Sequence, residues 1–237
     1  MVPTKRTTNN MFLTLNIITP KPTTPQVEYI INEEGAIAVV IRNWLTAEHA
    51  QDLHNRLTKE VPWIQGQMNM FGKTIDIPRT MFFLGDDHIK TYSYSRLTFP
   101  VQPWSNNTDL YKEIEKIRER ICNDTTLQRI TGVALQYDSC LLNFYRNGHD
   151  KIDPHSDREA LGPMNAVVTI SLGGTRKFVF KSVTKGANGR YLKIETNLNN
   201  GDLVLMAGRC QELWTHSIPR QDTDNARISL TYRLIHG

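Results

Sequence analysis

Three residues of the chain, His155, Asp157 and His216, have the types and the spacing of a metal site. His155 and Asp157 are separated by one residue after an apolar segment, so both can bind one ion from a single turn of the chain. We expect the third ligand after the segment 202–206, where His216 lies among a tryptophan and small polar residues. Two histidines and one carboxylate are typical of a non-haem iron(II) centre, although a lone histidine is more often structural.

Two expected strands carry polar side chains that could serve the same site. Asn143 and Tyr145 share one face of the strand before the metal residues, so an amide and a phenol can hydrogen-bond one ligand. The last strand, 226–235, has an apolar face and a polar face. The polar face either meets water at a sheet edge or lines a pocket in which a guanidinium binds the carboxylate of an oxoacid. It consists of Arg227, Ser229, Thr231 and Arg233.

Helices and short strands must position these residues. A helix is expected after Thr46, which can cap it, with Leu53 and Leu57 on one face. A second helix, 109–122, has four apolar residues at helical spacing. After residue 124, turns rich in glycine and asparagine separate short strands. The expected strands are 166–172, 177–181, 191–195, 202–206 and 226–235.

This order of elements predicts an α+β fold in which a jelly roll has supporting helices on one side. At 237 residues the chain is long enough for one large domain. Residues 1–26 contain basic residues but no acid, so we expect them to form a flexible basic arm. Residues 27–237 are assigned to one domain, with the helical support in 27–135 and the jelly-roll core in 136–237.

The composition argues against several classes of protein. The three cysteines are odd in number and lack C-x-x-C spacing, so neither a disulfide framework nor a zinc ribbon is indicated. No segment has the roughly 18 consecutive apolar residues of a membrane helix. We therefore expect an intracellular monomer without a membrane span, while organellar targeting by the acid-free arm stays open. The formal charge of +4 is compatible with a polyanionic partner.

Three motifs occur in order in the second half of the chain: N-F-Y-x-x-G-x-D-x-I-x-x-H-S-D at 143–157, W-T-H-S at 214–217 and A-R-I-S-L-T-Y-R at 226–233. Together they resemble the AlkB family of iron(II)/2-oxoglutarate-dependent dioxygenases. The chain looks closest to the animal AlkB homologue branch that repairs alkylated double-stranded DNA, because four further segments match. These are M-F-G-K at 70–73, I-P-R at 77–79, Y-S-Y-S at 92–95 and Q-P-W at 102–104. The resemblance implies a double-stranded β-helix, which is a jelly roll, preceded by a nucleotide-recognition region.

The resemblance also implies a role for each polar residue of the site. It makes His155, Asp157 and His216 the iron ligands, and Arg227 the partner of the distal carboxylate of 2-oxoglutarate. Arg233 would lie near the iron-binding carboxylate and the other end of the co-substrate. The implied cofactors are Fe(II), 2-oxoglutarate and O2. Further co-substrate positions are Asn143, Tyr145 and Ser229, the last of which replaces an asparagine found in many members.

The substrate implied by the resemblance is an N-alkylated base flipped out of single- or double-stranded DNA. Tyr94, opposed by His155, would sandwich this base. Phe71 would enter the base stack, whereas without the resemblance it could equally be a core residue. Tyr92 and Glu159 would lie near the polar edge of the base. The implied substrate-binding residues are Phe71, Tyr92, Tyr94, Ser95 and Glu159.

The implied activity is oxidative demethylation of bases such as 1-methyladenine and 3-methylcytosine, with release of formaldehyde and succinate, in the nucleus of a eukaryote. At two places the sequence differs from the closest branch of the family, and both bear on whether single- or double-stranded DNA is bound. Arg96 stands where the closest branch has glycine, and loop 219–224 has one base and two acids where that branch is often lysine-rich. Single-stranded DNA and RNA therefore stay open as substrates. The alternatives are an RNA demethylase, a protein hydroxylase, or a catalytically silent module that binds nucleic acid.

Overall fold

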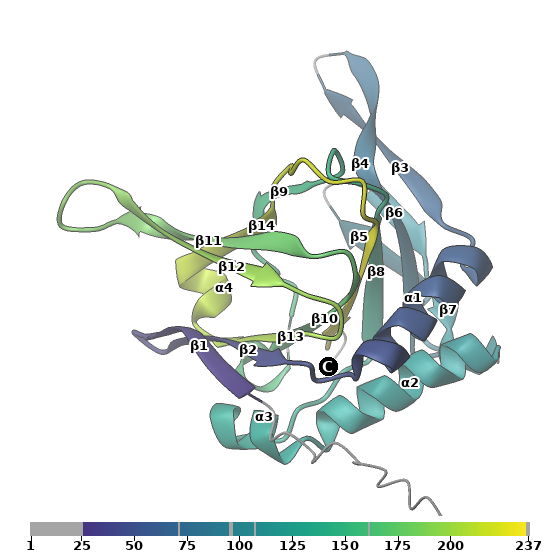
Figure 1. Ribbon diagram of the computed structural model, residues 1–237, viewed down its shortest axis with the longest axis horizontal. Coiled ribbons are helices and arrows are strands. Elements are labelled where there is room, and N and C mark those ends of the chain that lie inside the picture. Colours follow the sequence, from purple (N-terminus) through teal and green to yellow (C-terminus); the bar gives the residue numbers. More distant parts are fainter. Residues whose placement is uncertain (1–25, 71, 95–96, 107, 161, 236–237) are drawn as a thin grey trace, which may run out of the picture.

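The computed structural model describes residues 26–235 except 71, 95–96, 107 and 161. Residues 1–25, which make up nearly all of the expected basic arm, lie outside this part of the chain. Two sheets face each other, with the longer helices along the outer side of the larger sheet (Figure 1). The site expected from the sequence lies between the two sheets.

The larger sheet has β15 (Arg227–Arg233) near its centre, between β10 (Val167–Gly173) and β8 (Ser139–Tyr145). The interpretation of this last strand as a sheet edge is therefore wrong, because it pairs with a strand on each side. Its polar face instead lines the space between the sheets, and its apolar face packs into the core below the helices. Polar and apolar residues alternate along β15, so its polar side chains face the site and its apolar side chains face the core.

The larger sheet combines strands from both halves of the chain, so that residues 27–135 and 136–237 share one sheet. Distinct roles for these two segments stay a prediction. All pairs are antiparallel apart from β7 (Gln102–Pro103), which lies parallel to β4. The other strands are β1 (Gln26–Glu33), β2 (Ala36–Arg42), β3 (Ile64–Met70), β4 (Lys73–Gly85) and β13 (Leu203–Gly208).

The smaller sheet has the strand order β12 (Tyr191–Leu198), β11 (Arg176–Lys185), β14 (Trp214–Ile218) and β9 (Ile152–His155). Phe178 and Phe180 of β11 pack in one apolar cluster with Val204 and Met206 of β13, which joins the two sheets. These two facing antiparallel sheets confirm the predicted jelly roll. A separate two-stranded sheet consists of β5 (Thr91–Tyr94) and β6 (Leu97–Pro100).

The helices form where the sequence predicts them. Thr46 caps α1 (Ala47–Glu60) by accepting a hydrogen bond from the backbone N–H of His49, and Leu53 and Leu57 are buried. In α2 (Asp109–Cys122) the four apolar residues are all buried against the sheet. No helix in the described part of the chain is long and apolar enough to cross a membrane. The short helices are α3 (Thr125–Thr131), α4 (Cys210–Leu213), and two 3-10 turns at Trp104–Asn106 and Pro163–Asn165.

Candidate active site

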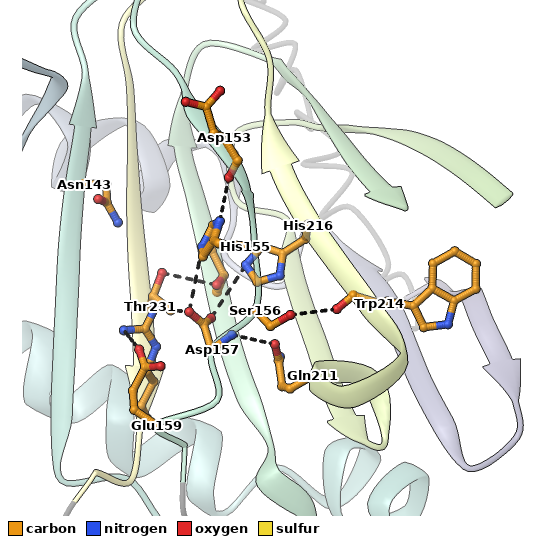
Figure 2. Close-up of polar contacts among 12 residues, drawn as sticks. Asn143, Asp153, His155, Ser156, Asp157, Glu159, Gln211, Trp214, His216 and Thr231 are labelled. Carbon is orange, nitrogen blue, oxygen red and sulfur yellow. Dashed lines mark hydrogen bonds and ion pairs between the residues drawn. The ribbon is translucent and has the colours of Figure 1, made fainter. Parts of the chain in front are cut away.

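His155 and His216 are direct cross-strand neighbours in the smaller sheet, with ring centroids 4.3 Å apart. Asp157 follows the end of β9 by two residues and turns back toward both rings (Figure 2). Nε2 of His155 lies 3.8 Å from Oδ1 of Asp157, and Nε2 of His216 lies 3.6 Å from Oδ2. One ligand atom from each residue lies within 4.8 Å of the other two, so a single metal ion could contact all three.

Burial and nearby charges keep both histidines neutral and the aspartate ionised. Burial lowers the pKa of His155, and it lowers the pKa of His216 to about 3, with His155 adding to the effect. Burial alone would raise the pKa of Asp157, but Arg233 and the two histidines hold it below its usual value. Neutral imidazole and ionised carboxylate are the forms that bind a metal ion.

The Oδ2 atom of Asp157 has no hydrogen-bond partner among the described residues, although this side chain is only 1% exposed. An unpartnered buried carboxylate oxygen is costly, and a cation held between the three residues would remove that cost. Two imidazoles and one carboxylate also match the ligand set that non-haem Fe(II) takes in proteins. The residues present therefore fit an iron(II) ion.

A hydrogen-bonded network joins the Asp157 carboxylate to strand β5. Arg233 donates from Nη2 to Oδ1 of Asp157 at 2.7 Å and from Nη1 to the Tyr92 hydroxyl at 2.7 Å. The Tyr92 hydroxyl in turn donates to Oε1 of Glu159 at 2.6 Å. Burial would lower the pKa of Arg233, but Asp157, Tyr92 and Glu159 raise it, so the guanidinium stays charged. The network brings together four residues that the sequence placed at this site.

A small pocket lies next to the metal residues, between the two sheets. Its polar side comes from β8, β10 and β15 of the larger sheet, and its apolar side comes from the smaller sheet. It includes the co-substrate positions expected from the motifs. The lining residues are Asn143, Tyr145, Ile152, His155, Thr169, Phe178, His216, Ile218, Arg227, Ser229 and Thr231.

Arg227 is a buried cation in this pocket, with 1% of its surface exposed. Its Nε donates to the hydroxyl of Ser171 at 2.8 Å, and its guanidinium carbon lies 5.3 Å from the ring centroid of Tyr145. Burial lowers the pKa of Arg227 to about 10, and no carboxylate among the described residues forms an ion pair with it. A ligand carboxylate would supply the missing negative charge, which fits a 2-oxoacid in this pocket.

Asn143 is held in place by a residue for which sequence reasoning had proposed no role. The buried Arg79 of β4 donates from Nε to Oδ1 of Asn143 at 2.7 Å, which fixes the orientation of the amide. Ser229 lies directly opposite Asn143 in the register of β15 and β8. Arg79 belongs to the I-P-R segment at 77–79, but the sequence could not show which side chain it would reach.

A family model described as the 2OG-Fe(II) oxygenase superfamily matches residues 37–233. The chain belongs to this family. Human "DNA oxidative demethylase ALKBH2" is 30% identical to it over 194 residues, which cover 78% of this chain and 69% of the human protein. Mouse "Alpha-ketoglutarate-dependent dioxygenase alkB homolog 3" is 30% identical over 188 residues, covering 76% of this chain and 60% of the mouse protein. The resemblance to AlkB proteins predicted from the motifs is confirmed.

Membership of the 2OG-Fe(II) oxygenase superfamily implies Fe(II), 2-oxoglutarate and O2 as cofactors and a dioxygenase activity. A solved structure, "The structure of OsALKBH1", is 18% identical to the chain, covers 88% of it and aligns with a TM-score of 0.49. The fold assignment rests on the strand order and the family match rather than on this likeness.

The side chains of Tyr92 and Glu159 lie in the hydrogen-bonded network of Arg233, whereas Phe71 and Ser95 lie outside the described residues. Of Tyr94, only the backbone in β5 is described. A groove opens beside His155, between β4 and β9, and we call it the entrance groove. Its lining residues are Met68, Ile75, Asp76, Ile77, Pro78, Arg79, Lys151, Ile152, Asp153, Pro154, His155 and Arg220.

Gln211 also holds the site together, and sequence reasoning missed it. Its Oε1 accepts the backbone N–H of Asp157 at 2.8 Å, and its side chain is buried. The neighbouring Ser156 donates from its hydroxyl to the carbonyl of Trp214 at 3.1 Å. These two bonds hold the loop between the candidate ligands against α4 and β14 (Figure 2). The only signal in the sequence was an amide five residues before His216.

We expect Gln211→Leu to lower the affinity of the protein for a divalent metal by about 10- to 100-fold, because the bond that orients the Asp157 loop is lost. Anaerobic titration with Co(II), followed by its visible absorbance, measures this affinity directly. Gln51→Leu on the exposed side of α1 is the matched control and should bind Co(II) like the wild type. Equal affinities for the two variants would show that Gln211 does not position the loop.

Proposed function

We propose that the protein removes N-linked methyl groups from DNA bases by oxidative demethylation, which directly reverses alkylation damage. The observation that carries this proposal is the cluster of His155, Asp157 and His216 beside the buried guanidinium of Arg227. DNA as the substrate is supported by the relatives named DNA oxidative demethylase. Such an enzyme would act where DNA is kept, in the nucleus if the organism is a eukaryote.

In this proposal His155, Asp157 and His216 hold Fe(II), and Arg227 binds the distal carboxylate of 2-oxoglutarate. When bound, iron(II) with 2-oxoglutarate and O2 supplies the oxidation that yields formaldehyde from the methyl group and succinate from the co-substrate. Arg233 keeps the Asp157 carboxylate ionised and oriented. The side chains available to hydrogen-bond the rest of the co-substrate are Asn143, Tyr145 and Ser229.

The proposed base-binding residues favour a base that carries a positive charge, as 1-methyladenine and 3-methylcytosine do. Tyr94 offers an aromatic face, which attracts a cation. Glu159 adds a carboxylate, which accepts a hydrogen bond from the Tyr92 hydroxyl. Flipping is easiest where methylation has already broken base pairing, which adds selectivity. Phe71 and Ser95 complete the proposed set, with Phe71 entering the base stack.

We infer further that the enzyme accepts single-stranded DNA and acts as a monomer. The loop 219–224 after the third proposed ligand has one basic and two acidic side chains. It therefore offers few phosphate contacts to the second strand of a DNA duplex. A monomer is supported because one chain supplies every residue proposed to bind iron and the co-substrate.

A substrate panel tests this proposal. Formaldehyde release is measured with one methylated sequence offered as single-stranded DNA, as duplex DNA and as RNA, and with a methyl-lysine peptide as a non-nucleic-acid substrate. We expect the single-stranded DNA to be turned over fastest. Turnover of RNA alone would show that the protein is an RNA demethylase. Turnover of the peptide alone would show that nucleic acid is not its substrate.

A further inference from the structure

The outer face of the smaller sheet carries a strip of basic side chains that the proposed chemistry does not use. We define the basic strip as Lys177 and Lys181 of β11, Lys193 of β12 and Arg220 in the loop after β14. These four side chains line one surface groove together with small polar and apolar residues of β9, β11 and β14. In Figure 1 the hairpin of β11 and β12 extends beyond the other strands of the sheet, and Lys181 and Lys193 on it are exposed.

Two lysines of the basic strip lie opposite each other on neighbouring strands. Lys181 and Lys193 are direct cross-strand partners, and like charges in such positions are destabilising. Among the described residues of β11 and β12 that line the groove, Glu195 is the one acid. Its carboxylate lies 2.7 Å from Nζ of Lys177 and 2.5 Å from Nζ of Lys193. One acid cannot balance the strip, so a surplus of positive charge remains for a ligand. Neighbouring lysines with this surplus of positive charge on an exposed face suit an anionic partner.

The groove of the basic strip adjoins the entrance groove beside His155. Arg220, Ile152, Asp153 and Pro154 line both of them. The Asp153 carboxylate at this junction is paired with Lys151 at 2.6 Å, so it does not present a free negative charge to a ligand that passes by. A polyanion that enters at His155 can therefore pass this junction beside a paired carboxylate and reach the smaller sheet.

An exposed aromatic ring lies at the far end of the basic strip. Tyr191 is 46% exposed, and the ammonium groups of Lys181 and Lys185 lie 4.4 and 5.7 Å from its ring centroid. Proteins that bind single-stranded nucleic acid combine a basic groove with exposed aromatic rings. The basic side chains contact the phosphates, and unpaired nucleobases stack on the ring. A fully paired duplex has no free base face to offer to Tyr191.

We propose that the basic strip and Tyr191 bind a single-stranded segment of the substrate DNA, which runs from the base at His155 across the outer face of the smaller sheet. This proposal rests on the proposed function, since it takes DNA as the substrate. It adds that substrate preference depends on strand length and on single-stranded character, through contacts far from the reacting methyl group.

The double variant Lys181→Gln/Lys193→Gln tests the charges. With a fluorescent single strand of about 15 nucleotides, we expect binding about fivefold to tenfold weaker at low salt. The slope of log affinity against log salt should fall in magnitude by about 1.4, or about 0.7 for each lost phosphate contact. Lys59→Gln/Lys116→Gln, on the exposed sides of α1 and α2, makes the same change in net charge and should leave both quantities unchanged.

Tyr191→Ala tests the stacking contact separately. It should weaken binding of the same strand by about fivefold or more without changing the salt slope, because no charge is removed. Neither variant should change the turnover of a trinucleotide centred on 1-methyladenine, because we expect so short a strand not to extend to Lys181, Lys193 or Tyr191.

Four outcomes would overturn the proposal. The first is wild-type affinity and salt slope in the Lys181→Gln/Lys193→Gln variant. The second is an equal loss of affinity for a fully paired duplex, and the third is slower turnover of the trinucleotide. The fourth is a wild type that turns over methylated DNA but does not bind the long strand more tightly than the trinucleotide. Absence of both binding and turnover in the wild type would instead reject the proposed function together with this inference.

Discussion

His155→Ala is expected to reduce formaldehyde release from methylated DNA by more than about 1000-fold, which corresponds to about 4 kcal/mol at the transition state. The substitution removes one of the three side chains proposed to hold the iron. His155 is partly exposed and hydrogen-bonds through Nδ1 to the carbonyl of Asp153, so the fold should survive its loss. Turnover is measured with wild type and variant at saturating Fe(II), and circular dichroism checks the fold.

His149→Ala is the control for this prediction, because His149 lies in an exposed turn of the same loop region and is not part of the cluster. It should retain full turnover. Asp157→Ala tests the metal site less specifically, because it also removes the ion-pair partner of the buried Arg233. An unpaired buried charge lowers the stability by about 3 to 5 kcal/mol. Full activity in His155→Ala would contradict the assignment of the metal site.

Arg227→Met is expected to have opposite effects on function and on stability. The KM for 2-oxoglutarate should rise by about 100-fold or more, because a desolvated charge pair with the co-substrate is lost. The free energy of unfolding without ligand should stay the same or increase, because a buried cation without a carboxylate partner is replaced by an apolar chain of similar length. Steady-state kinetics and urea denaturation measure the two quantities.

Arg129→Met, on the exposed side of α3, should change neither quantity and is the matched control. A variant at position 227 that loses stability together with activity would indicate a structural role for Arg227. A KM for 2-oxoglutarate that stays at the wild-type value would show that the co-substrate carboxylate binds elsewhere.

The sequence predicted the elements of the fold well where a periodic pattern carried the information. Thr46 caps its helix as expected, and the apolar positions of α2 are buried. The alternation in β15 predicted which residues face the pocket, but it could not distinguish a central strand from an edge strand. That distinction depends on which other strands pair with β15. The polar and apolar pattern of a single strand contains no information about this long-range pairing.

The candidate site was predictable as a set of residues but not as a geometry. The motifs placed His155 and His216 in one cluster, and the register of β9 and β14 shows why they meet. The bonds that Gln211 and Arg79 make to this site could not be predicted, because each depends on the direction of one side chain across the fold. The basic strip could not be predicted either, since its three lysines come from two strands and its arginine from a loop.

The central claim is that this chain couples 2-oxoglutarate consumption to the demethylation of DNA. The most direct test measures succinate and formaldehyde together, with single-stranded DNA that contains 1-methyladenine, while Fe(II) and 2-oxoglutarate are omitted in turn. We expect equal amounts of the two products in the complete reaction and neither product when Fe(II) or 2-oxoglutarate is omitted. Binding of the DNA without any iron-dependent succinate or formaldehyde would contradict it and leave a nucleic-acid-binding module with a silent site.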